Sequence, residues 1–87
     1  MIYLVTNAPQ LLKSTKYTII SVEESLELLG PLKVVGTDTE TEGFDPFSKK
    51  LLSLQLGCFD FQIVIDCLTV DIQKYKSYLE SERVFLF

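Results

Sequence analysis

The chain has 87 residues, of which 47% are apolar, four are Gly and three are Pro. A chain of this length forms one small domain that buries about 60 to 65% of its unfolded surface, and the composition favours a packed globular fold over disorder. The net charge of −4 argues against a free-standing nucleic-acid-binding domain, unless bound divalent cations reverse the charge of its acidic groups.

The two cysteines, Cys58 and Cys67, lack C-x-x-C spacing, and the chain has no histidine. This chain alone therefore cannot form a structural zinc site, and we expect free thiols in a reducing compartment. The absence of histidine also removes the commonest general base. No apolar run approaches the roughly 18 residues of a membrane span, and no signal-like leader is present. We expect a soluble, cytoplasmic protein that does not bind membranes.

The first predicted elements are two short strands and a helix. Residues 1–5 and 17–20 are β-prone and could pair with each other. Ser21 and Glu24 have the spacing of a capping box, in which each side chain accepts the other residue's backbone N–H. We therefore predict a helix over 21–29 that ends at the following Gly-Pro pair. Its glutamates lie near the positive end of the helix dipole and are interpreted as solvated side chains, not metal ligands.

Three further strands are predicted at residues 33–39, 51–56 and 62–67. The turns between them are short, so an antiparallel meander is the simplest arrangement. In the second and third strands large apolar residues alternate with other residues, and one face of the sheet is more apolar than the other. Another element must therefore cover that face.

A second helix, capped by Thr69 or Asp71, is the predicted cover. Its apolar residues recur at helical spacing: Ile72, Tyr75, Tyr78 and Leu79. The two tyrosines are interpreted as core residues and not as a base-stacking pair. Residues 83–87 form a final strand-like run, and its bulky apolar end suggests the front part of a longer protein. Exposed strand edges would then favour homo-oligomers.

Asp38 and Glu40 are the candidate functional residues. Side chains alternate along a strand, so the two carboxylates share one face. Unpaired buried charge is strongly unfavourable, so this arrangement indicates a cation site, with a divalent metal as the natural occupant. Two-metal phosphoryl-transfer sites hold ions about 3.5 to 4 Å apart, which carboxylates at i and i+2 can bind together. The alternative is an exposed polar strand end, because D-x-E triplets also arise by chance.

The segment 34–46, followed by 51–57 and 62–66, resembles the first motif and following strands of the DEDD 3′-5′ exonucleases. The resemblance is closest to the proofreading exonuclease domain of family A DNA polymerases. It implies a truncated ribonuclease H-like α/β fold, with a three-stranded antiparallel meander, flanking helices and a final strand parallel to the first. Residues 1–87 would then be the N-terminal part of a single exonuclease domain.

The resemblance also implies roles for individual residues. Asp38 and Glu40 match the first two of four acids that bind two Mg²⁺ or Mn²⁺ ions. Thr39 matches a backbone contact to the 3′-terminal nucleotide, and Phe44 an apolar residue that packs against the terminal base. The motifs that carry the other two acids are absent from the 87 residues. Three aspartates are not in matching contexts and receive no role: Asp60, Asp66 and Asp71.

The implied function is hydrolysis of single-stranded DNA from its 3′ end by two-metal-ion catalysis in a full-length parent. The fragment alone is expected to be inactive, because half of the metal ligands are missing. The alternative is a non-catalytic ribonuclease H-like scaffold or protein-interaction module that assembles through its final strand. The pair Asp38 and Glu40 argues against this alternative, since a scaffold has no use for two convergent carboxylates.

Overall fold

The computed structural model describes residues 1–9, 16–41 and 51–87. Its centre is a six-stranded sheet in the order β2-β1-β5-β4-β3-β6. The strands are β1 (Ile2–Val5), β2 (Thr18–Ile19), β3 (Val34–Thr41), β4 (Leu51–Gly57), β5 (Gln62–Asp66) and β6 (Val84–Leu86).

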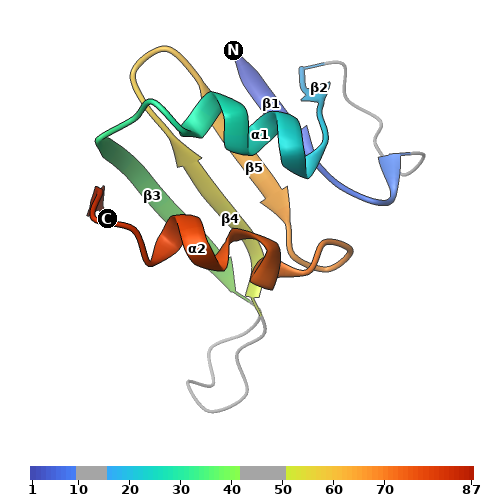
Figure 1. The fold of residues 1–87 in the computed structure, drawn as a ribbon. Helices are drawn as coiled ribbons and strands as arrows, with labels where there is room; N and C mark the ends of the chain where they lie inside the picture. The colour runs from blue at the N-terminus through green and yellow to red at the C-terminus, as the bar shows by residue number, and fades with distance from the viewer. Residues whose placement is uncertain (10–15, 42–50) are drawn as a thin grey trace.

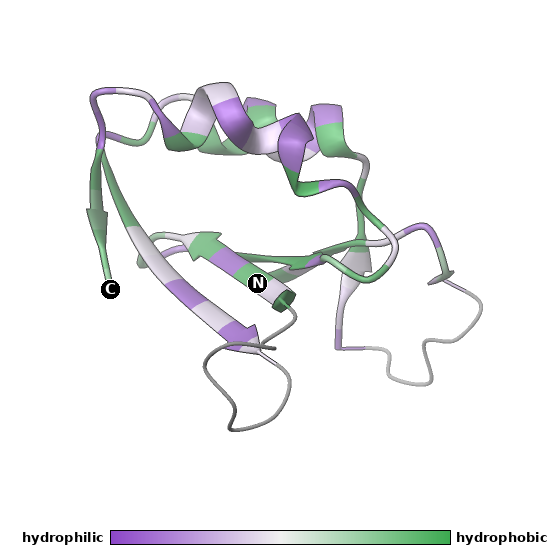
Figure 2. Cartoon of the chain, turned by 90° about the horizontal axis from the view of Figure 1, so that it is seen from below, coloured by the Kyte–Doolittle hydropathy of each residue, from purple (hydrophilic) through white to green (hydrophobic). Residues whose placement is uncertain are grey.

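Helix α1 (Val22–Leu29) lies between β2 and β3 in the chain, and η2 (Ile72–Tyr75) with α2 (Lys76–Leu79) lies between β5 and β6. Both α1 and α2 lie over the same face of the sheet (Figure 1). Figure 2 shows these helices on one side of the sheet only. No helix in the described part of the chain is long and apolar enough to cross a membrane.

The predicted meander is confirmed. Strands β3, β4 and β5 pair antiparallel in that order, and β6 pairs parallel with β3. A short turn joins β4 to β5, where the Cys58 N–H donates to the Phe61 carbonyl oxygen at 2.9 Å. Gly57 is required there, because a Cβ at this position would lie only 2.9 Å from the Gln62 Cα. The described residues therefore have the ribonuclease H-like α/β arrangement expected from the sequence.

Strand β1 has two neighbours in the sheet, and the sequence indicated only one of them. It pairs with β2, a pairing that the sequence left open, and the pairing is parallel. It also pairs parallel with β5 on its other side. Ile2 pairs with Gln62, so the second contact joins residues sixty positions apart. Local patterns predict that a segment is a strand, but they carry no signal for a partner so far along the chain.

Helix α1 begins as predicted. The Ser21 hydroxyl accepts the Glu24 N–H at 3.0 Å, and the Glu24 carboxylate accepts the Ser21 N–H at 3.1 Å. These bonds satisfy two backbone donors that the first turn of a helix leaves free. The glutamates of the helix are exposed, in agreement with their interpretation as solvated side chains.

The single second helix predicted from the spacing of apolar residues is wrong in detail. Asp71 accepts the Gln73 N–H at 2.9 Å and begins the 3₁₀ turn η2, and α2 starts only after Tyr75. Tyr75 has φ −102° and ψ 3°, outside the helical region, and this break separates the two short helices. Its ring enters the core, so packing of the tyrosine outweighs the continuity of the helix.

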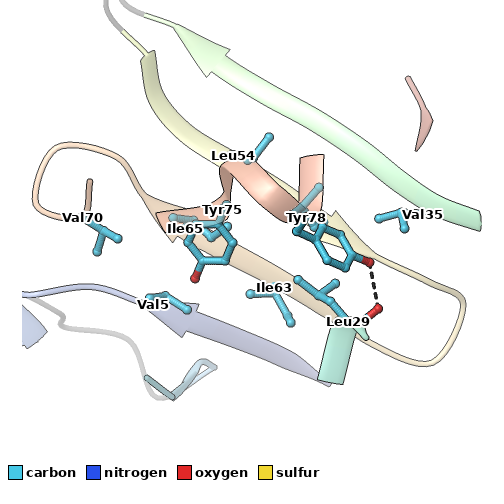
Figure 3. Close-up of a cluster of buried hydrophobic side chains, with 10 residues drawn as sticks. Val5, Leu29, Val35, Leu54, Ile63, Ile65, Val70, Tyr75 and Tyr78 are labelled. Atoms are coloured by element: carbon cyan, nitrogen blue, oxygen red, sulfur yellow. Dashed lines mark hydrogen bonds between the residues drawn. The ribbon is translucent and has the colours of Figure 1, made fainter. Parts of the chain in front are cut away.

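The core lies between the sheet and the helices (Figure 3). The side chains that pack there are Val5, Leu29, Val35, Leu54, Leu56, Ile63, Ile65, Val70, Tyr75 and Tyr78. The Tyr75 hydroxyl lies 2.7 Å from the Ser25 Oγ, and the Tyr78 hydroxyl donates to the Leu29 carbonyl oxygen at 2.8 Å. Both tyrosines are thus core residues, as predicted, and their polar ends are satisfied.

Asp66 links the loops that follow β1 and β5. Its Oδ2 accepts hydrogen bonds from the Thr6 hydroxyl at 2.7 Å and the Thr69 hydroxyl at 2.8 Å, and its Oδ1 accepts the Leu68 N–H at 3.1 Å. Burial raises the pKa of Asp66, but these donors together outweigh burial and lower it below its usual value. The charged carboxylate therefore stabilises the attachment of β1 to the sheet.

Acid should weaken this attachment. The Asp66 pKa is lower in the folded than in the unfolded chain, so its stabilisation is present above the unfolded value of about 3.9 and is lost as pH falls below it. We expect Asp66→Asn to lower the free energy of unfolding by about 1 to 2 kcal/mol at pH 6. Between pH 6 and pH 3, the free energy of unfolding should then fall less in this variant than in wild type.

Urea denaturation at both pH values measures these differences. Asp60→Asn is the matched control, since Asp60 is exposed in the turn between β4 and β5. Equal acid sensitivity of wild type and Asp66→Asn would contradict the assignment.

Candidate functional site

The register of β3 and β4 decides which way the acids point. Thr37 and Thr39 pair with Leu56 and Leu54, which are buried under the helices. Because side chains alternate along a strand, Asp38 and Glu40 point to the opposite face. This is the face of the sheet away from the helices (Figure 2). We call it the open face.

Asp38 and Glu40 both lie within β3, and both are exposed. Two positions of strand separate their Cα atoms by about 7 Å, so both carboxylates can approach one region of the open face. The register of β3 and β4 shifts between Glu40 and Thr41. Such irregularities bend the strand and re-aim side chains, and here one follows directly after the second acid.

Thr39 lies between the acids, with its side chain on the helix side of the sheet. Its backbone N–H donates to the Asp38 Oδ1 at 2.8 Å. This bond orients the Asp38 carboxylate without using Oδ2. Phe44, the predicted contact to the terminal base, lies outside the described residues.

The donor chemistry at the pair fits Mg²⁺ or Mn²⁺. Both ions prefer oxygen ligands, and Mg²⁺ typically binds proteins through one or two carboxylates and keeps several waters. Asp38 and Glu40 supply such oxygens on an accessible face. Within residues 1–9, 16–41 and 51–87, no group of three His, Cys, Asp or Glu side chains is placed to hold a metal ion. In this part of the chain the pair therefore has no third acidic, histidine or cysteine ligand beside it.

The other aspartates left without a role serve the fold or face solvent. Asp66 receives the hydrogen bonds described above, and Asp71 caps η2 through the Gln73 N–H. Asp60 is exposed in the turn between β4 and β5.

Two polar neighbours of the acids were not singled out from the sequence. In the register of β3 and β4, Gln55 lies opposite Asp38 and Ser53 lies opposite Glu40. Cross-strand partners point to the same face, so both side chains share the open face with the carboxylates. The alternation of leucines with Ser53 and Gln55 is visible in the sequence, and adding the antiparallel register would have identified them.

Exposed apolar side chains lie on the open face near the start of β3, before the acids. Val34, Val84 and Leu86 belong to the paired strands β3 and β6, and they are 51%, 53% and 56% exposed. Val34 and Val84 also line a groove of about 520 Å³ that contains neither acid. Apolar exposure of this kind is typical of surfaces that another element covers.

No protein-family model matches the chain, and no curated protein matches it significantly. Solved structures do match. RNase D of Trypanosoma brucei in complex with RNA U12 is 14% identical with a TM-score of 0.66, and the match covers 98% of this chain and 30% of that one.

Two other similar structures are the EXO domain of Aedes aegypti Nibbler and the exoribonuclease RNase D of Escherichia coli. The Nibbler domain is 13% identical with a TM-score of 0.59, and the match covers 85% of this chain and 30% of that chain. RNase D of E. coli is 21% identical with a TM-score of 0.57, and the match covers 69% of this chain and 16% of that chain. The chain thus spans less than a third of each of these proteins, and it has part of the fold of an exonuclease domain.

Proposed function

We propose that the chain is the N-terminal part of a single nuclease domain that removes nucleotides from the 3′ end of a single strand. The observation that carries this proposal is the pair of exposed carboxylates on the open face, in a fold shared with exonuclease domains. No group of three acidic side chains in the described part of the chain is placed to hold a metal ion, so the 87-residue chain alone is expected to be inactive. A cytoplasmic location remains a prediction.

In the proposed reaction, water attacks the phosphorus of the terminal phosphodiester and the bond to the 3′ oxygen breaks. The products are a nucleoside 5′-monophosphate and a strand shortened by one nucleotide with a new 3′ hydroxyl. Asp38 and Glu40 would hold two Mg²⁺ or Mn²⁺ ions at the open face, and the Thr39 N–H keeps the Asp38 carboxylate oriented. Bound divalent ions activate water and offset negative charge on the leaving oxygen.

The more specific part of the proposal is whether the substrate is DNA or RNA. The sequence resemblance to proofreading domains of family A DNA polymerases favours DNA. The similar structures favour RNA, since one is an exoribonuclease and another was determined with RNA. We take single-stranded DNA as the first substrate to test and RNA as the alternative.

The test uses a longer polypeptide that carries this chain together with the residues that follow it in its reading frame. Single-stranded DNA and RNA labelled at the 5′ end are incubated with Mg²⁺ or Mn²⁺. We expect the substrate to be shortened from its 3′ end by one nucleotide at a time, and a chelator to abolish the activity. We also expect the enzyme to cleave either DNA or RNA faster than the other. Internal cleavage, or no cleavage of either strand, would contradict the proposal.

A non-catalytic scaffold is the second candidate, and the exposed apolar residues of β3 and β6 support it. Such a protein would associate through β6 and the open face, giving homo-oligomers. Sedimentation velocity over a range of concentrations tests for association. Oligomers combined with no nuclease activity in the longer polypeptide would favour the scaffold.

A further inference from the structure

We infer that Gln55 is a positioning residue for Asp38, an inference that rests on the proposed metal site. Gln55 lies directly opposite Asp38 in the register of β3 and β4. The Cβ atoms of directly opposed residues are about 4.5 to 5.5 Å apart, so a glutamine side chain can reach the opposing carboxylate.

One oxygen of Asp38 and the side-chain amide of Gln55 make no hydrogen bond among the described residues. Asp38 Oδ1 accepts the Thr39 N–H at 2.8 Å. No described hydrogen bond engages Asp38 Oδ2 or the Gln55 carboxamide, although Gln55 is half-buried. The Gln55 amide can therefore donate to Oδ2 after a change of side-chain rotamer, and the two donors would then fix both oxygens of one carboxylate.

An amide suits this position better than a charged group. A lysine or arginine opposite Asp38 would compete with a metal cation for the carboxylate, and an acid there would place a second negative charge beside Asp38. A neutral donor orients the carboxylate and leaves its charge for the cation. Hydrogen-bond partners of metal ligands commonly contribute 10- to 100-fold to metal affinity.

Gln62 provides a matched control on the same face. It pairs with Gly57, two residues along β4 from Gln55, so its side chain also points to the open face. Its amide nitrogen already donates to the Cys58 carbonyl oxygen at 2.8 Å. Gln62→Leu therefore makes the same chemical change as Gln55→Leu on the same face, away from the partner of Asp38.

The experiment measures Mn²⁺ binding to the chain by paramagnetic broadening of backbone amide signals around Asp38 and Glu40. We expect Gln55→Leu to weaken Mn²⁺ binding about tenfold. Gln62→Leu should stay within twofold of wild type. In an Asp38→Asn background, Gln55→Leu should cause no further loss, because its effect passes through the Asp38 carboxylate. A merely structural role would give the same loss in both backgrounds.

Unchanged affinity in Gln55→Leu, or an equal loss in the Asp38→Asn background, would overturn the role of Gln55. Absence of broadening near Asp38 and Glu40 in the wild-type chain would overturn it as well. None of these results decides the nuclease proposal, which is tested separately by strand shortening in the longer polypeptide.

Discussion

Asp38→Asn is expected to lower the nuclease activity of the longer polypeptide about 10²- to 10⁴-fold. An amide keeps the shape of the side chain but removes the anionic oxygen that, in the proposed function, holds a divalent ion. Loss of roughly 3 to 5 kcal/mol of transition-state stabilisation corresponds to this range of rates. The fold should be unaffected, because the Asp38 side chain is exposed. Single-turnover assays at saturating Mg²⁺ measure the change.

Asp60→Asn is the control for Asp38→Asn, since it removes the same charge from an exposed position in the turn between β4 and β5. Its activity should stay near that of wild type. Full activity in Asp38→Asn, combined with a higher melting temperature, would contradict a metal-binding role and favour the scaffold.

Tyr75→Ala is expected to remove a large part of the stability of the fold. The side chain is 0% exposed, and its hydroxyl lies 2.7 Å from the Ser25 Oγ. Truncating a buried aromatic residue costs about 3 to 5 kcal/mol, whereas domains of this kind are stable by only about 5 to 15 kcal/mol. Urea denaturation followed by far-ultraviolet circular dichroism measures the loss.

Tyr75→Phe separates the hydroxyl from the ring. It keeps the packing and loses one hydrogen bond, so we expect a cost of about 1 kcal/mol. Ser25 would still donate to the Val22 carbonyl oxygen at 2.6 Å, so its hydroxyl would not be left unsatisfied. A cost for Tyr75→Phe close to that of Tyr75→Ala would show that the hydrogen bond, and not the ring, stabilises this part of the core.

The features predicted correctly from the sequence depend on short stretches of chain. The capping box at Ser21 and Glu24 involves residues three apart, and the alternation in β4 and β5 is visible in each strand alone. The parallel pairing of β1 with β5 joins residues sixty positions apart, and no local pattern indicates it. The break at Tyr75 was missed because helical spacing records which side chains are apolar and not how deeply each one packs.

In the candidate site, too, the sequence was sufficient for features within one strand and insufficient for features that depend on two strands. The shared face of Asp38 and Glu40 follows from the period of a strand, so the sequence was sufficient to predict it. The placement of Gln55 opposite Asp38 depends on the register of two strands, which the sequence analysis did not derive. Phe44 lies outside the described residues, so its role stays a prediction.

The parallel pairing of β1 with β5 has a consequence for synthesis on the ribosome. Strand β1 is made first, but its central partner follows sixty residues later. At about 5 to 20 residues per second, β1 waits roughly 3 to 12 seconds before β5 is translated, and longer before it leaves the exit tunnel. During this time its apolar side chains are exposed in a nascent chain. The N-terminal strand therefore cannot take its place beside β5 until β5 has left the ribosome, and until then it is a segment on which a chaperone would act.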